Sequence, residues 1–296
     1  MEAVLILIDV CSDLHVDHHR HTTKLWNAPG EGPQIHNDQG LYIDFDFAWT
    51  RNPGAGVIVI AGDISDSISE TQGVLTEAAR HYEHVVYVDG NHEFQGLRAT
   101  PIQEQMDLLA DMQVAIPNLI YLDGGSMVRR DIQGVAFIGG NGWYDWRAYE
   151  ELGYTYPMCF ASWDERSMDR HLNFGDDLFP NVTGYDQATR INREITTAQN
   201  DPNVRAIVVV THTAPLRECL EFSTNPKYNV ASPSYSNTLF REHLDNPDPG
   251  KLALWIYGHT HKRKMFTHNG VTLVNNCYGY PREVHGSVWA MANFEV

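Results

Sequence analysis

The chain has 296 residues, of which 43% are hydrophobic and 20% are charged, so one large or two small globular domains with a substantial core are expected. Its 38 acidic side chains outnumber 21 basic ones, and the formal charge of −17 argues against sequence-independent binding to a nucleic-acid backbone. No stretch approaches membrane-spanning length, and the four cysteines are scattered without a CxxC pair. We therefore expect a cytoplasmic protein with reduced core thiols, no membrane partner and no strong nucleic-acid footprint.

Short apolar runs rich in β-branched residues recur along the chain and predict buried central strands. Five of these runs end in a polar cluster, and in chain order they span residues 4–10, 57–62, 85–90, 206–211 and 252–258. Two further strands are expected at 135–140 and 271–276, and helices at 67–82, 102–112 and 185–200. This alternation predicts a layered α/β domain in which side chains at the carboxyl ends of the strands converge on one crevice.

One region, residues 143–185, fits the alternation poorly and is rich in Trp, Tyr, Phe and Met. We interpret it as an insertion that covers the mouth of the crevice. No linker and no repeat of fixed period divides the sequence, so a single domain over residues 1–296 is expected.

The polar clusters after the five strands share a set of oxygen and nitrogen donors. The set comprises Asp13, His15, Asp63, Asn91, His212, His259 and His261. Because it contains no thiolate, it suits Mn²⁺, Fe, Zn²⁺ or Mg²⁺ rather than a cysteine-bound structural zinc. Seven donors are too many for one ordinary ion but adequate for two divalent ions that share a carboxylate, with Mn²⁺ favoured. Two such ions can clamp the attacking and leaving oxygens of a displacement at phosphorus.

Five motifs, SDLH, GDISD, GNHE, THTAP and GHTH, occur in this order, and from Asp13 of the first to His261 of the last they span residues 13 to 261. In them the sequence resembles the calcineurin-like metallophosphoesterase superfamily. The resemblance covers nearly the whole chain, and although each motif alone is weak, five in order at strand ends are very specific. It implies a four-layer α/β fold, in which a central β-sandwich is flanked by helices.

The resemblance also implies a role for each matching residue. The first metal would be bound by Asp13, His15 and His261, and the second by Asn91, His212 and His259. Asp63 would bridge the two ions together with a hydroxide that acts as the nucleophile. His92 would protonate the leaving oxygen, and Asp66 would hold the imidazole of His92 by a hydrogen bond.

Several neighbouring residues have a structural interpretation beside the functional one. Asp9 competes with Asp13, but it lies inside its apolar run, so Asp13 is preferred as the ligand. Glu93 is expected to begin a helix rather than to bind metal. Asp66 could simply cap the turn that follows it.

A solvated loop is the expected place for three further histidines, His18, His19 and His21, although contact with substrate or metal stays open. The basic residues 262–264, KRK, are expected in a solvated turn, with contact to a substrate phosphate as the alternative. Trp143 and Tyr144 are expected to pack in the interior rather than to stack on a base. Asn141 is a candidate for the rim of the site.

The expected reaction is hydrolysis of a phosphoester or phosphoanhydride of a small substrate, possibly a nucleotide, by metal-bound hydroxide. Serine/threonine protein phosphatases share GNHE, but their pattern has arginines where this chain has Ser67 and Asp89. A diester carries less charge than an ionised monoester, so a phosphodiesterase is favoured over a phosphomonoesterase, above all a protein phosphatase. A DNA or RNA nuclease is the other enzymatic alternative, and acidity disfavours it. A non-catalytic scaffold is least favoured because all ligands and His92 are present.

Overall fold

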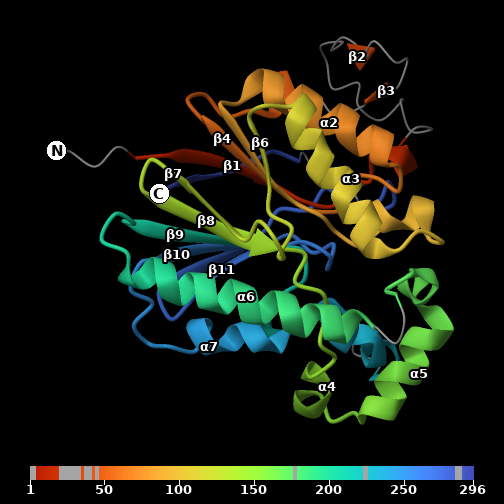
Figure 1. The fold of residues 1–296 in the computed structure, drawn as a ribbon. Helices are drawn as coiled ribbons and strands as arrows, with labels where there is room; N and C mark the ends of the chain where they lie inside the picture. Colours follow the sequence, from red (N-terminus) through yellow and green to blue (C-terminus); the bar gives the residue numbers. More distant parts are fainter. Residues whose placement is uncertain are drawn as a thin grey trace.

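The computed structural model describes residues 5–19, 35–36, 42–43, 47–175, 179–222, 226–283 and 289–296. Two β-sheets dominate them (Figure 1). The first sheet has the order β13 (Ala292–Glu295), β1 (Leu7–Cys11), β4 (Val57–Ala61), β5 (His84–Val88) and β6 (Leu119–Tyr121). The second has the order β11 (Lys264–His268), β12 (Val271–Asn275), β10 (Leu252–Ile256), β9 (Ala206–Thr211), β8 (Val135–Gly140) and β7 (Arg129–Ile132).

The central strands of each sheet run parallel. In the first sheet β1, β4, β5 and β6 are parallel, and β13 pairs with β1 in the antiparallel direction. In the second sheet β8, β9, β10 and β12 are parallel, and the edge strands β7 and β11 are antiparallel to their neighbours. Parallel strands end at the same edge of a sheet, so the loops that follow them lie together.

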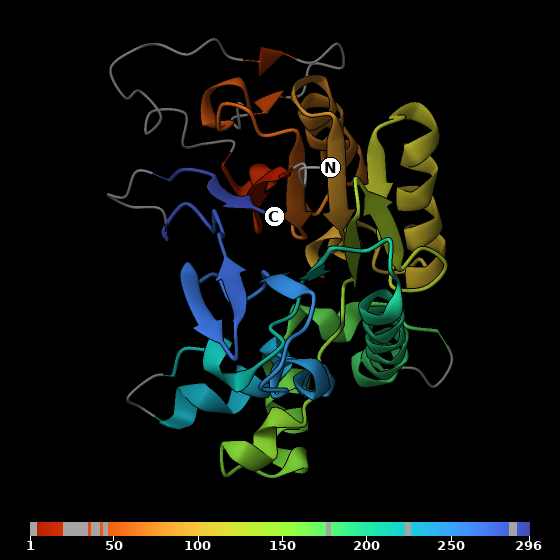
Figure 2. The same cartoon turned by 90° about the vertical axis from the view of Figure 1, so that its left-hand side faces the viewer.

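Helices cover the outer face of each sheet. The first sheet is covered by α2 (Ile68–His81) and α3 (Ile102–Ala115), and the second by α6 (Pro180–Asn200) and the short α7 (Arg241–Leu244). In both Figure 1 and Figure 2, α2 and α3 lie on the opposite side of the sheets from α6. The four-layer α/β fold expected from the motifs is therefore confirmed.

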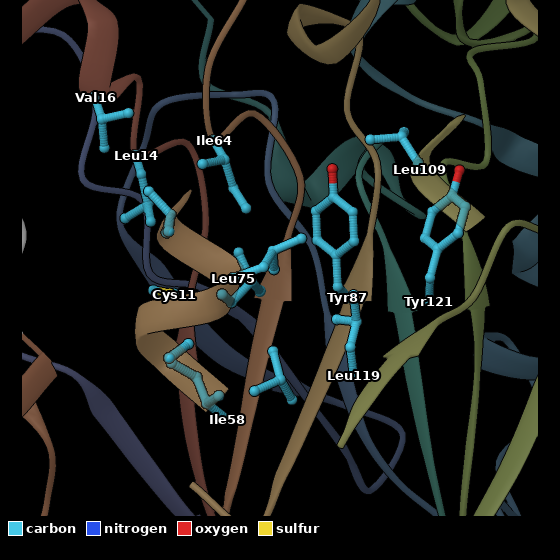
Figure 3. Packing of buried hydrophobic residues seen from close by; sticks show 14 of the residues in the cluster. Cys11, Leu14, Val16, Ile58, Ile64, Leu75, Tyr87, Leu109, Leu119 and Tyr121 are labelled. Carbon is cyan, nitrogen blue, oxygen red and sulfur yellow. The ribbon is translucent and has the colours of Figure 1, made fainter. Parts of the chain in front are cut away.

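Alternating side chains of the strands fill two different cores. Val86 and Val88 of β5 point between the sheets, whereas Val85 and Tyr87 point towards the helices. Figure 3 shows Tyr87 in this helix-facing core together with Leu75 of α2 and Leu109 of α3. Because both faces of the strand are buried, its sequence reads as a continuous apolar run rather than an alternating one.

All seven expected strands are present, but the two main sheets contain four others that were not expected from the sequence. Strand β6 has only three residues, and the edge strands β7, β11 and β13 carry exposed polar side chains that weaken the apolar signal. The helix expected from residue 185 begins at Pro180, where proline occupies the first helical turn.

The remaining elements are short. The proposed insertion, residues 143–185, contains α4 (Ala148–Glu151), α5 (Tyr156–Arg166), the 3-10 helix η3 (Met168–His171) and the start of α6. Elsewhere lie η1 (Val16–His19), β2 (Ile35–His36), β3 (Tyr42–Ile43), α1 (Phe47–Thr50), η2 (His92–Leu97), η4 (Arg217–Cys219), η5 (Pro226–Tyr235) and η6 (Thr238–Phe240). Among the helices described, none is both long and apolar enough to cross a membrane.

Candidate metal centre

Five of the seven candidate ligands have a left-handed backbone conformation at the ends of three strands. The φ angles are 52° for Asp13 and 43° for His15 after β1, 57° for Asp63 after β4, and 65° for His259 and 51° for His261 after β10. Residues other than glycine rarely adopt this conformation, and such strain is concentrated at functional sites. The backbone thus bends sharply after each strand, and the side chains turn into the same space.

Glycines before the ligands allow the strand-end loops to approach one another. A Cβ atom on Gly90 would lie 2.1 Å from Oδ1 of Asp63, and one on Gly62 would lie 2.5 Å from Nδ1 of His212. Gly62 also has a positive φ of 81°. The glycines of GDISD and GNHE are therefore required by close contact with the ligands of other loops.

One group of ligands comprises Asp13, His15, Asp63 and His261, whose ligand atoms lie within 4.8 Å of one another. The Nε2 atoms of His15 and His261 face each other at 3.0 Å. Nε2 of His15 lies 3.7 Å from Oδ2 of Asp63, and Nε2 of His261 lies 3.5 Å from Oδ1 of Asp13. These are the four residues expected around the first ion.

A second group comprises Asp63, His212 and His259, again with ligand atoms within 4.8 Å of one another. Nε2 of His212 lies 3.3 Å from Oδ2 of Asp63 and 3.2 Å from Oδ1 of Asn91. All seven candidate ligands are thus brought together, and Asp63 belongs to both groups.

Three histidines are held by hydrogen bonds through the ring nitrogen that faces away from the cluster. Nδ1 of His212 lies 2.8 Å from the carbonyl oxygen of Ala61, and Nε2 of His259 lies 3.1 Å from that of Ser234. Nδ1 of His261 lies 2.9 Å from the Glu283 carboxylate. Such partners fix the ring orientation and leave the other nitrogen free to bind a metal.

The donor set fits two divalent ions that share a carboxylate. Oδ2 of Asp63 is buried and has no hydrogen-bond partner of ordinary geometry among the described residues, although Nε2 of His15 lies 3.7 Å and Nε2 of His212 3.3 Å from it. A buried carboxylate oxygen in this state needs a compensating cation. Nitrogen and oxygen donors without thiolate suit the metals expected from the sequence.

The protonation of the ligands follows from burial and from their neighbours. Burial lowers the pKa of His259 to about 3 and that of His15 well below its usual range, so both rings are neutral, as metal binding requires. Burial opposes ionisation of Asp63, but His212 and His92 outweigh it and hold the pKa of this carboxyl well below its usual range. Asp63 likewise outweighs burial at His212 and raises its pKa to about 10.

The proposed acid, His92, lies beside the ligand cluster and contacts the proposed orienting carboxylate. Its Nδ1 is 2.6 Å from Oδ1 of Asp66, and its Nε2 is 3.0 Å from the hydroxyl of Tyr280. Burial of His92 opposes its charge, but the carboxylates of Asp63 and Asp66 outweigh burial and raise its pKa to about 9. Asp66 is not the N-cap of α2, a position that Ser67 occupies.

Asp169 is a member of the site that the motifs do not reveal. This buried carboxylate of η3 accepts a hydrogen bond of 3.0 Å from Nδ2 of Asn91, which leaves the Asn91 oxygen facing His212. It also accepts hydrogen bonds from Gln95 and Tyr144. No sequence signal identified it, because a single aspartate in an irregular aromatic region has no motif of its own.

Glu93 lies in the first turn of η2, as expected, but its carboxylate also joins two motif loops. It accepts hydrogen bonds from the backbone N–H groups of Asp63 (3.0 Å), Ile64 (2.6 Å) and Gly90 (2.6 Å). Glu93 thus connects the GDISD loop to the GNHE loop. Asp9, the competitor of Asp13, accepts hydrogen bonds from Asn52 and Tyr82 away from the cluster.

Two predictions for neighbouring polar residues were wrong. Asn141 is fully buried and donates to Asp89 at 2.9 Å, so it belongs to the interior rather than the rim. His19 is buried rather than solvated, and its Nε2 lies 2.9 Å from the carbonyl oxygen of Gly279. His18 is half exposed, with its ring 5.8 Å from that of His15, whereas His21 lies outside the described residues.

The aromatic and basic residues near the site also have defined places. Trp143 and Tyr144 are buried, as expected, and the Tyr144 ring stacks on His259 at 6.2 Å. The basic residues 262–264 do not line the pocket at the centre, and Lys264 instead donates to the carbonyl oxygen of Glu218.

A pocket of about 370 Å³ opens over the ligands and His92. Its walls come from α5 and η3, from η5 and from the loop after β12. In Figure 1, α5 lies beyond one end of the sheets, below α3. The pocket thus joins the candidate metal centre to the proposed insertion.

A β-sandwich with such an oxygen and nitrogen cluster at its strand ends defines a metal-dependent hydrolase of phosphate esters. The chain belongs to the calcineurin-like phosphoesterase family, whose model matches residues 6–263. It is a metal-dependent phosphoesterase, and the two ligand groups agree with the binuclear centre of this family.

Similar proteins include a phosphopantetheinyl hydrolase of Mycobacterium tuberculosis, whose structure has a TM-score of 0.72 at 18% identity and covers 99% of this chain and 96% of its own. A dimetal phosphatase of Danio rerio has a TM-score of 0.51 at 14% identity, over 91% of this chain and 86% of its own. The uncharacterized protein L509 of Acanthamoeba polyphaga mimivirus is 25% identical over 240 residues, which are 76% of this chain and 79% of L509. The structural likenesses concern the fold.

Proposed function

We propose that this protein is a binuclear, Mn²⁺-preferring phosphodiesterase that cleaves small organic phosphates, nucleotides among them, in the cytoplasm. The observation that carries the proposal is the pair of ligand groups that share Asp63, with His92 at their edge. The four cysteines are all free and buried, which agrees with a reducing compartment.

We infer that seven residues hold the two ions: Asp13, His15, Asp63, Asn91, His212, His259 and His261. When bound, the ions would supply Lewis-acid charge at the phosphoryl oxygens and lower the pKa of the attacking water. His92 holds a proton at neutral pH and faces the pocket, so it is placed to give that proton to a leaving oxygen. Asp66 orients the imidazole and stabilises its charged form.

The preference for a diester rests on the two positions that carry arginine in protein phosphatases. Neither Ser67 nor Asp89 lines the pocket. Asp89 is buried and accepts hydrogen bonds from Tyr121 and Asn141, so its carboxylate does not contact a substrate in the pocket. The preference for a diester is supported because those two positions lack guanidinium groups. A dianionic monoester needs such groups more than a diester does.

The decisive experiment compares bis(4-nitrophenyl) phosphate with 4-nitrophenyl phosphate at pH 8 with Mn²⁺ and with a chelator. We expect metal-dependent cleavage of both, faster for the diester. Efficient hydrolysis of phosphopeptides with negligible diester cleavage would overturn the diesterase proposal. Single-stranded DNA tests the nuclease alternative, and a phosphopantetheinyl ester belongs in the panel because of the name of the Mycobacterium tuberculosis structure. No metal-dependent hydrolysis of any substrate would indicate a scaffold.

A further inference from the structure

Two arginines line the pocket away from the ligand cluster. Arg166 is at the C-terminal end of α5, and Arg282 follows β12, so the two side chains come from separate parts of the chain. They are the two Lys or Arg side chains among the described residues that line this pocket. The chain has a formal charge of −17, so two positive charges at one pocket are unusual and favour the binding of an anionic ligand there.

The carboxylates of the pocket already have partners. Asp63 belongs to the ligand cluster, Asp169 accepts hydrogen bonds from Asn91 and Gln95, and Glu283 accepts from His261. None of them forms an ion pair with either arginine in the described part of the chain. Neither guanidinium group is thus held in an ion pair by a carboxylate that lines the pocket, so both can bind an anion.

Each of the two guanidinium groups has only weak interactions with the rest of the described protein. Arg166, whose side chain is 56% exposed, has its sequence neighbour Glu165 at 3.6 Å, and that carboxylate is 73% exposed. Such an exposed pair contributes little stability and is easily exchanged for another anion. The guanidinium of Arg282 lies 5.7 Å from the centre of the Tyr280 ring and forms no ion pair with a described carboxylate.

Both arginines lie outside the group that would hold the reactive phosphate. Among the described residues, Arg282 forms no hydrogen bond or ion pair with the ligands. It lies over the ring of Tyr280, which in turn stacks on the ring of His15 at 4.4 Å. Arg166 lies on the wall formed by the proposed insertion, near Trp163 and the half-exposed Met168. The pocket of about 370 Å³ has room for an organic group between the ligands and this wall.

We propose that Arg166 and Arg282 bind a second anionic group of the substrate, so that the natural substrate is an organic phosphodiester that carries a further phosphate. The inference rests on the proposed function, since it extends the same pocket. Guanidinium groups suit this role because their donors match phosphate oxygens in paired, charge-assisted hydrogen bonds. The apolar wall would contact the organic group that joins the two phosphates.

Two chromogenic substrates that differ by one phosphate test the proposal. The enzyme with Mn²⁺ is given thymidine 5′-(4-nitrophenyl phosphate) with and without a 3′-phosphate. We expect the 3′-phosphate to lower KM by about tenfold, as charge-assisted hydrogen bonds would. The Arg166→Gln/Arg282→Gln variant should lose this advantage but cleave bis(4-nitrophenyl) phosphate normally. Arg170→Gln is the matched control, because Arg170 is exposed on η3 and does not line the pocket.

Calorimetry separates this inference from the proposed function. Thymidine 3′,5′-bisphosphate should bind to the Mn²⁺-loaded protein more tightly than thymidine 5′-phosphate, and the double variant should bind both equally. If neither chromogenic substrate is cleaved, the proposed function fails while the binding data still decide the inference. No gain from the 3′-phosphate, or a gain that persists in the double variant, would overturn it. An equal loss on bis(4-nitrophenyl) phosphate would also overturn it, because the arginines would then contact the reactive phosphate.

Discussion

Nδ1 of His92 lies 2.6 Å from a carboxylate oxygen of Asp66. The histidine of the GNHE motif is therefore held by the last aspartate of the GDISD motif. The two residues are far apart in sequence and follow neighbouring parallel strands, β4 and β5. The opposite nitrogen of His92, Nε2, faces the hydroxyl of Tyr280 at 3.0 Å. The ring is thus oriented with one nitrogen towards its carboxylate and the other towards the pocket.

The first prediction concerns the pH dependence of turnover. Despite burial, Asp63 and Asp66 raise the pKa of His92 to about 9, so the acid form is present at neutral pH and is lost as pH rises through this value. Asp66→Asn removes one of the stabilising charges, so the basic limb of kcat should move by about one unit to lower pH. The measurement is a pH profile of kcat with a poor leaving group. An unchanged limb in Asp66→Asn would contradict the orienting role.

A second prediction separates the acid from the ligands. His92→Ala should retain its metal but lose roughly 10²–10⁴ in turnover on a substrate with a poor leaving group, the range of general-acid catalysis. With nitrophenolate as the leaving group the loss should be smaller, since that group needs little protonation. Turnover on both substrates and metal content by elemental analysis are measured together. Equal losses on the two substrates would show that His92 does not act as the acid.

The third prediction tests the shared carboxylate. Asp63 belongs to both ligand groups, so Asp63→Asn should weaken the binding of both ions together and abolish most activity. Calorimetric titration of the chelator-treated protein with Mn²⁺ provides the binding readout, and circular dichroism checks the fold. Loss of one ion alone, or full metal content with near-normal turnover, would rule out bridging by Asp63.

A fourth prediction concerns Asp169, which we expect to position Asn91 through the 3.0 Å hydrogen bond to its amide. Asp169→Ala should reduce the affinity for Mn²⁺ by about 10–100-fold, the usual cost of losing a partner behind a metal ligand. The matched control is Asp145→Ala. Asp145 is also buried, but it accepts hydrogen bonds from Thr238 and does not line the pocket. A similar loss of affinity in both variants would point to general damage rather than positioning.

Much of the molecule could be predicted from the sequence because the signals are local. Buried parallel strands such as β4 and β9 read as apolar runs, and the polar residues that follow them must lie at one edge of the sheets. Gly62 and Gly90 allow the close approach of the loops that carry Asp63 and Asn91. The five motifs therefore predicted the family, the four-layer fold and a common place for all seven candidate ligands.

Only the tertiary structure reveals which residues hold the metal ligands and His92 in place, and what shape the pocket has. Asp169, Tyr280 and Glu283 meet Asn91, His92 and His261 only after distant segments pack together, and isolated residues in irregular loops carry no periodic signal. Asn141 followed a strand like the ligands, yet its side chain turned into the interior, because the side-chain direction depends on the backbone at each strand end. Substrate contacts such as those proposed for Arg166 depend on the same long-range packing, so they could not be predicted from a local sequence pattern.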